Sequence, residues 1–135
     1  MNTKFITFLL ALICSLPMMA KVYIVTSPNK SLVVNISVDK TLKWEIKSGK
    51  TVVLFPSEIA LQTDKQCLGK NMKVKKSSIC NNKVGNRKYQ QLTLGAGDYD
   101  LQFRVFDDAA AYRFISKKVI NKVINETSEF IFADD

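Results

Sequence analysis

The side chains best suited to chemistry are four aspartates, Asp98, Asp100, Asp107 and Asp108. Carboxylates at such spacing can coordinate calcium or act as the acid and base of a glycosidase. Asp98 and Asp100 lie two residues apart in a strand-like segment, so we expect both on one solvent-exposed face. Nothing there would desolvate a carboxyl group and give it the raised pKa that a general acid needs. We therefore interpret all four as strand-end and turn residues.

The absence of histidine excludes several kinds of site. The chain has 135 residues, a net charge of +8 and no histidine. A Ser-His-Asp triad, a Cys-His pair, a His-ligated zinc ion and a histidine pH switch are therefore impossible within it. The length allows one domain of modest size.

Two of the three cysteines, Cys67 and Cys80, lie in a stretch that we expect to be exposed. In an oxidising compartment they could form one disulfide that closes a short loop. Two unpaired thiols are the alternative, and the spacing alone does not decide between them.

Between Lys65 and Lys88 the chain is basic and contains no acidic residue. The residues that we single out as an anionic-ligand patch are Lys70, Lys73, Lys75, Lys76, Arg87 and Lys88. Such a patch favours a polyanion. Nucleic acid is not the expected ligand, because the protein looks exported and no aromatic residue lies among the basic residues before Tyr89. The remaining candidate ligands are acidic glycans or an anionic cell surface. The simpler interpretation, which we prefer, is a solvated hairpin whose lysines protect an edge strand.

The first twenty residues have the layout of a signal peptide. Lys4 precedes a helical apolar run over residues 5–16, and Pro17 and Ala20 follow. The run is shorter than a membrane-spanning helix needs. We predict cleavage after Ala20, a mature domain over residues 21–135, and a secreted or periplasmic protein with no transmembrane segment after cleavage.

Alternating apolar and polar residues predict short strands in the first half of the mature chain. They cover residues 32–38, 42–47 and 51–55, with Pro56 expected to end the third strand. Tight turns between them predict an antiparallel meander. Trp44 alternates with lysines on the face that also carries Leu42 and Ile46, so we expect it in the core.

The second half repeats this pattern. A hairpin is predicted from residues 89–94 and 99–105, with further strands at residues 109–114 and 129–132. Residues 118–125 stay open, because their apolar spacing is helical whereas their β-branched residues favour strand or irregular chain. Together these segments predict an all-β, antiparallel β-sandwich.

Several segments, read in order, resemble the amino-terminal domain of glycoside hydrolase family 97. Residues 25–29 resemble its opening Ser-Pro-Asp/Asn turn, and residues 86–94 its Arg-x-x-Tyr-Asn-Glu-Leu segment. Residues 103–114 are similar to its most specific signature, Phe-Arg-x-Phe-Asn/Asp-Asp-Gly-x-Ala-Phe/Tyr-Arg-Tyr. Residues 56–61 look like its Pro-Ser-x-Leu-Gly-Leu stretch. Ala60 and Ala109 stand where the family prefers glycine, which puts the local turn geometry in question.

The resemblance implies a partial β-super-sandwich of the galactose-mutarotase type that packs against a catalytic (β/α)8 barrel. The family comprises secreted α-glucosidases and α-galactosidases, found chiefly in glycan-degrading Bacteroidetes. Its catalytic glutamates lie in the barrel, and its calcium lies mostly there and partly beyond the matched region. No catalytic or metal residue and no cofactor can therefore be assigned to this chain.

The leading hypothesis is a secreted, non-catalytic module of a family 97-type α-glycosidase, truncated before the barrel, that packs on the barrel and shapes its substrate site. The expected partners are that barrel or the missing portion of the domain, and carbohydrate. The alternative is a stand-alone secreted module that uses the basic patch to bind an anionic glycan or cell surface. A reading frame that continues into a barrel would make the whole product an enzyme.

Overall fold

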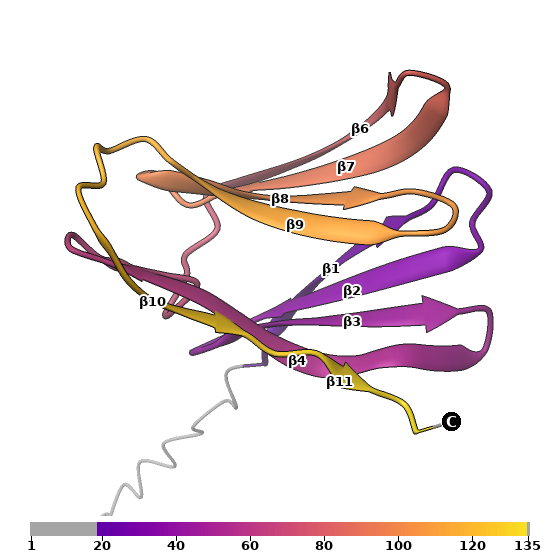
Figure 1. Cartoon of the computed structure of the whole chain (residues 1–135), viewed down its shortest axis with the longest axis horizontal. Coiled ribbons are helices and arrows are strands. Elements are labelled where there is room, and N and C mark those ends of the chain that lie inside the picture. The colour runs from indigo at the N-terminus through magenta and orange to yellow at the C-terminus, as the bar shows by residue number, and fades with distance from the viewer. Residues whose placement is uncertain (1–18, 135) are drawn as a thin grey trace, which may run out of the picture.

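Two antiparallel β-sheets face each other in the computed structural model, which describes residues 19–134 (Figure 1). All but the last two residues of the predicted signal peptide lie outside this range. The strands of the first sheet are β1 (Lys21–Thr26), β2 (Leu32–Val38), β3 (Leu42–Ser48), β4 (Thr51–Thr63), β5 (Cys67–Leu68), β10 (Val123–Ser128) and β11 (Ile131–Phe132). Those of the second are β6 (Lys76–Val84), β7 (Arg87–Gly95), β8 (Tyr99–Val105) and β9 (Ala110–Ser116). The predicted β-sandwich is confirmed.

The first sheet has the order β1-β2-β3-β4-β10, and β5 and β11 also pair with β4. The predicted antiparallel meander is confirmed as β2, β3 and β4. Gly49 makes the turn between β3 and β4 with a φ of 58°, a conformation that favours glycine. A strand that the sequence pattern did not predict, β1, pairs with β2 along its whole length.

The prediction that Pro56 ends a strand is wrong, since β4 runs on to Thr63. Trp44 faces Ser57 and Ile46 faces Leu54, so β4 advances three residues where β3 advances two. Pro56 therefore lies in a β-bulge, where its missing N–H breaks no ladder hydrogen bond.

The second sheet has the order β6-β7-β8-β9, so the predicted hairpin is confirmed as β7 and β8. β6 is an edge strand and all of its residues are exposed. That placement agrees with the simpler interpretation of the basic stretch, a solvated hairpin with lysines on an edge.

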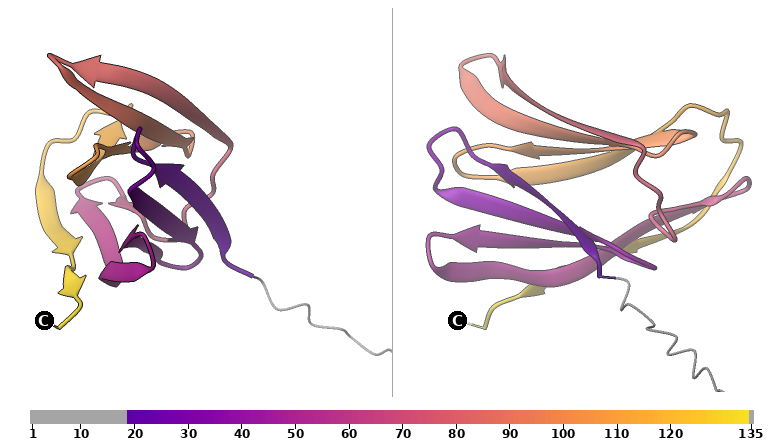
Figure 2. Two further views of the ribbon diagram at one scale, coloured as in Figure 1. Left: turned by 90° about the vertical axis from the view of Figure 1, so that its right-hand side faces the viewer. Right: turned by 180° about the vertical axis from the view of Figure 1, so that it is seen from behind.

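The chain returns to the first sheet through β10, which crosses from β9 to the far edge of β4 (Figures 1 and 2). The open question over residues 118–125 is settled as irregular chain followed by strand from Val123. The strand predicted over residues 129–132 pairs only at Ile131 and Phe132. The rings of Phe130 and Phe132 stack with centroids 6.2 Å apart.

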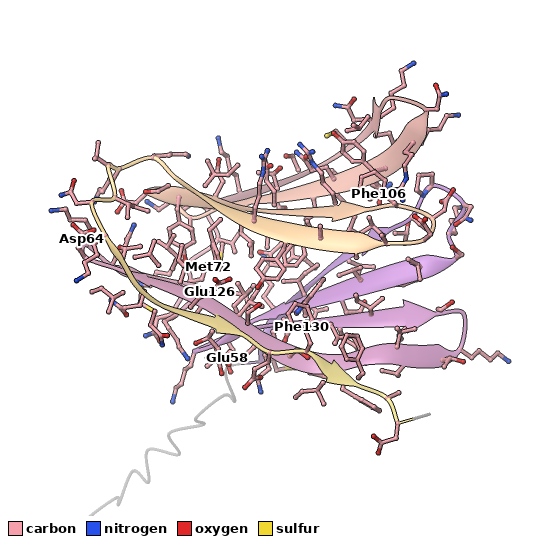
Figure 3. All side chains as sticks on the ribbon, viewed as in Figure 1. Glu58, Asp64, Met72, Phe106, Glu126 and Phe130 are labelled. Carbon is pink, nitrogen blue, oxygen red and sulfur yellow. The ribbon has the colours of Figure 1, made fainter. Side chains whose placement is uncertain are left out.

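The core lies between the sheets, where the inward residues of both meet (Figure 3). Trp44 is 3% exposed and packs against Phe103 and Tyr112 of the second sheet, so its predicted place in the core is confirmed. Neither Ala60 nor Ala109 has a positive φ. Alanine therefore fits both positions without backbone strain.

The described residues include no helix that is long and apolar enough to cross a membrane.

Candidate functional site

Asp98 directly precedes β8 and Asp100 is its second residue, and each is paired with a lysine that follows β9. Asp98 is 2.9 Å from the Nζ atom of Lys118, and Asp100 is 3.2 Å from that of Lys117. The backbone N–H of Lys117 also donates to the carbonyl of Asp98. These contacts join the ends of neighbouring strands, as expected for strand-end residues. The expected solvent exposure holds for Asp98, whereas Asp100 is half-buried and its Oδ1 atom is out of contact with solvent.

Asp107 and Asp108 lie in the turn between β8 and β9. Asp107 accepts a hydrogen bond of 2.9 Å from the backbone N–H of Asn29, which ties this turn to the β1–β2 loop. Asp108 forms an ion pair with Arg87. Both contacts agree with the interpretation as turn residues.

The acidic residues offer no metal centre, because within residues 19–134 no group of three Asp, Glu, Cys or His side chains converges. Calcium needs six to eight oxygen ligands. The acidic residues described therefore do not fit that ion.

The basic patch does not form one continuous surface. Lys73, Lys75 and Lys76 lie at the start of β6 or just before it, whereas Lys88 and Arg87 lie beyond its far end. β6 has nine residues, which at the rise of a strand separates these groups by about 27 Å. One compact ligand cannot contact both groups.

Two members of the patch already have acidic partners. Lys70 pairs with Glu58 of β4, and this hydrogen bond raises the pKa of Lys70 above its ordinary value. Arg87 pairs with Asp108, and its guanidinium carbon lies 4.8 Å from the centre of the Phe106 ring. Both cations are therefore partly neutralised and held in place, which lowers their capacity to attract a further anion.

A groove of about 560 Å³ opens at the tip of the β6–β7 hairpin. It is lined by Pro28, Asn81, Asn82, Lys83, Lys88 and Tyr89. Lys83 and Lys88 are direct cross-strand partners, an arrangement that repulsion between like charges disfavours. Of the predicted patch, Lys88 alone reaches this groove. The sequence pattern missed Lys83 as its partner because the register of the hairpin was unknown.

Cys67 and Cys80 are both free thiols in the structure, so the disulfide that the spacing allowed is not formed there. Cys67 is half-buried on β5, which pairs with β4, and Cys80 is exposed on β6. The two cysteines belong to strands of different sheets. Their separation of thirteen positions in the sequence does not predict that placement.

Asp64 fixes the segment that leads into β10, a role that the sequence pattern did not reveal. Its carboxylate accepts backbone N–H bonds of 3.3 Å from both Asn121 and Lys122. Burial alone would raise the pKa of Asp64, but these N–H donors and the neighbouring Lys65 lower it below its ordinary value. The contact is structural.

The fold and these contacts define a β-sandwich module in which Asp64, Asp98, Asp100, Asp107 and Asp108 pair with lysine, arginine or backbone N–H groups. The family described as Glycosyl-hydrolase 97 N-terminal matches residues 25–135. The chain therefore belongs to the amino-terminal domain family of the family 97 glycoside hydrolases.

Known proteins agree with this assignment. The chain is 29% identical to a retaining alpha-galactosidase from Bacteroides thetaiotaomicron, over 98% of its own length and 22% of that protein. Its fold matches a beta-arabinopyranosidase crystal structure with a TM-score of 0.70 and 20% identity, over 82% of the chain and 21% of that protein. It also matches a family 97 enzyme from a Pseudoalteromonas species in complex with panose, with a TM-score of 0.64, 19% identity, and coverage of 82% and 20%. The chain thus spans about a fifth of the length of these relatives.

Proposed function

We propose that this chain is a secreted, non-catalytic amino-terminal module of a family 97-type α-glycosidase acting on α-glucosides or α-galactosides. The observation that carries the proposal is the family match over residues 25–135. The pairing of the Asp98–Asp108 carboxylates with lysine, arginine or backbone N–H supports it, because a general acid needs a carboxyl group that is free to exchange its proton. Hydrolysis then belongs to a catalytic barrel on which the module packs.

Exposed apolar side chains supply a surface for that packing. The last two strands and the segments beside them carry five such residues, namely Val123, Ile124, Phe130, Ile131 and Phe132. Their exposed fractions lie between 50% and 62%. Val123 and Ile124 lie beside the end of β4 at Thr63, whereas Phe130, Ile131 and Phe132 are consecutive and lie beside Phe55 of β4, which is 44% exposed. Exposed apolar residues that gather in one place mark interaction surfaces. We therefore assign the β10–β11 surface, defined by Phe130, Ile131 and Phe132, to contact with the barrel, where it would help to shape the substrate site.

Export belongs to the same proposal. The signal-peptide layout of residues 1–20 supports a secreted or periplasmic location with cleavage after Ala20. The intact mass of the protein recovered from the envelope and medium of the source cells tests this. A mass that corresponds to a polypeptide beginning at Lys21 supports the proposal. A mass that corresponds to a polypeptide still carrying the first twenty residues contradicts it.

An activity assay tests the non-catalytic assignment. The isolated chain, supplied with aryl α-glucosides and α-galactosides and with calcium, should show no turnover. The retaining alpha-galactosidase of Bacteroides thetaiotaomicron, assayed in parallel, shows that the reagents work. If the isolated chain shows turnover, and this activity stays with the chain through several purification columns, the assignment is overturned.

Fragment complementation tests the packing. The chain is co-expressed with that relative after removal of the relative's own matching amino-terminal segment, and we expect the two to co-purify. Phe132→Lys should abolish co-purification, because it places a charge in the apolar β10–β11 surface. The matched control is Ile79→Lys, at a residue of β6 that is 52% exposed and lies on the other sheet. Equal retention of both variants would contradict the assigned surface.

The stand-alone binding module remains a second hypothesis, supported only by the hairpin groove. Its lysine pair, Lys83 and Lys88, leaves a local positive charge that an anionic glycan or cell surface could neutralise. Retention on a heparin-like matrix that falls with salt and is lost in Lys83→Gln/Lys88→Gln would support it. Retention that is independent of salt would contradict it.

A further inference from the structure

Two arginines of the family signature lie side by side on the outer face of the second sheet. Arg104 of β8 faces Ala111 of β9, and Gln102 of β8 faces Arg113 of β9. Phe103 and Val105 point into the core, so the alternation of a strand directs Arg104 outward. This register makes Arg104 and Arg113 diagonal neighbours, whose backbone positions are about 7–8 Å apart.

Glutamine side chains orient both arginines. The Nε–H of Arg104 donates to Oε1 of Gln91 at 2.8 Å, and the Nε–H of Arg113 donates to Oε1 of Gln102 at 2.9 Å. The guanidinium carbon of Arg104 also lies 4.9 Å from the centre of the Tyr89 ring. Each bond uses only one of the five guanidinium N–H donors. Both guanidinium groups are therefore held in place, and their terminal NH₂ groups stay available to bind an anion.

Neither Arg104 nor Arg113 has a carboxylate partner among the residues that the structure describes. Arg87, by contrast, is paired with Asp108. The aspartate of the same strand face, Asp100, is already paired with Lys117 at 3.2 Å. The outer face of β8 and β9 therefore carries two oriented positive charges that the described chain does not neutralise.

Both arginines line one pocket of about 170 Å³, together with Gln102, Ala111 and Tyr112. The small side chain of Ala111 leaves this space open opposite Arg104. We propose that this pocket binds the oxyanion of an acidic sugar residue, a carboxylate or a sulfate ester. Planar guanidinium forks match such oxyanions through paired N–H bonds.

The size of the pocket limits the ligand. Pockets for drug-sized molecules have about 300–1,000 Å³, so this one holds a single anionic group and leaves the rest of a glycan outside. The amide NH₂ of Gln102 can donate to a neighbouring sugar hydroxyl, because its Oε1 already accepts the Arg113 bond. The choice of a sugar-borne anion rests on the proposed glycosidase function, whereas the choice of an anion rests on the arginines.

The test follows the Nε–H resonances of the arginines in the full chain by nuclear magnetic resonance. The probes are galacturonate and galactose 6-sulfate, with galactose, acetate and inorganic sulfate as controls. We expect saturable shifts of the Arg104 and Arg113 signals with at least one acidic sugar and none with galactose. The two acidic sugars separate a carboxylate from a sulfate ester.

Variants separate the pocket from general charge. Arg113→Gln and Arg104→Gln should each weaken binding about tenfold or more, because hydrogen bonds to a charged group are lost. Arg87→Gln removes the same charge elsewhere and should leave binding unchanged. Arg113→Lys keeps the charge without the fork and should bind weakly, while its spectrum shows whether the fold is intact.

Three results would overturn the proposal. One is the absence of saturable shifts with either acidic sugar. Another is acetate or inorganic sulfate binding as tightly as the acidic sugars, which would make the pocket an unspecific anion site. The third is equal weakening by Arg87→Gln and Arg113→Gln. None of these results bears on co-purification with the barrel or on turnover, so failure here is distinguishable from failure of the proposed function.

Discussion

The hydroxyl group of Tyr99 accepts a hydrogen bond of 3.1 Å from the backbone N–H of Gly69. Tyr99 begins β8 of the second sheet, and Gly69 directly follows β5 of the first, so this bond joins the two sheets inside the sandwich. Tyr99 is 6% exposed. Burying a polar group without a hydrogen-bond partner costs free energy, so this bond stabilises the contact between the two sheets.

Tyr99→Phe should therefore destabilise the protein. The substitution keeps the ring but leaves the Gly69 N–H without an acceptor, at a cost of about 1–3 kcal/mol. Urea unfolding followed by the fluorescence of Trp44, the one tryptophan of the chain, measures the free energy of unfolding. Tyr112→Phe is the control, because the Tyr112–Ser128 hydroxyl bond is exposed and its loss should cost less. Equal losses in the two variants would contradict the assigned role of Tyr99.

Stability should also fall at alkaline pH through Tyr99. Burial raises the pKa of Tyr99, and the Gly69 N–H bond only partly opposes that rise. Below the ordinary tyrosine pKa of about 10, the residue is protonated in the folded and unfolded chains, so its contribution is fully present. As the pH rises above that value, the unfolded chain loses this proton first, and the free energy of unfolding decreases.

The pH prediction is checked by urea unfolding at several values between neutral and strongly alkaline pH. Other groups titrate in the same range, so the informative quantity is the difference between the wild type and Tyr99→Phe. We expect this difference to shrink as the pH rises. A difference that stays constant would show that the pKa of Tyr99 is the same in both states.

Gly69→Ala should be more damaging than the same change at Gly49. Gly69 has a φ of 88°, and a Cβ atom there would lie 2.8 Å from the backbone oxygen of Ile59. Backbone strain and overpacking together predict a loss of about 3 kcal/mol. Gly49 has a φ of 58° with open space around it, so only the left-handed backbone cost of about 1–2 kcal/mol applies. Thermal unfolding compares the two variants, and a larger shift at Gly49 would refute this order.

Phe103→Ala tests the central packing of the two sheets. Phe103 is fully buried and contacts Trp44 and Tyr112 through its ring. Its truncation should cost about 3–5 kcal/mol, because it removes apolar contacts and leaves a cavity. Phe132→Ala, at a residue that is 62% exposed, should change stability by less than about 1 kcal/mol. Similar losses would mean that β11 is more tightly packed in solution than its exposure indicates.

The local pattern of the sequence determined the strands whose two faces differ in polarity. Residues 99–105 alternate strictly and residues 32–38 alternate except at Val33, and both strands occur with the predicted bounds. The exclusion of histidine chemistry likewise followed from composition alone. β1 was missed although its burial also alternates in part, because Lys21–Thr26 carries apolar residues on both faces. The continuation of β4 past Pro56 was missed because a bulge is a property of two paired strands.

Tertiary structure alone decided which distant residues meet. The basic residues between Lys65 and Lys88 are close in sequence, yet β6 separates them in space. Arg104 and Arg113 belong to the same signature segment, but only the register of β8 and β9 places both of them at one pocket. The reason is physical: alternation is fixed by the backbone of one strand, whereas register and the pairing of the two sheets depend on packing across the whole core.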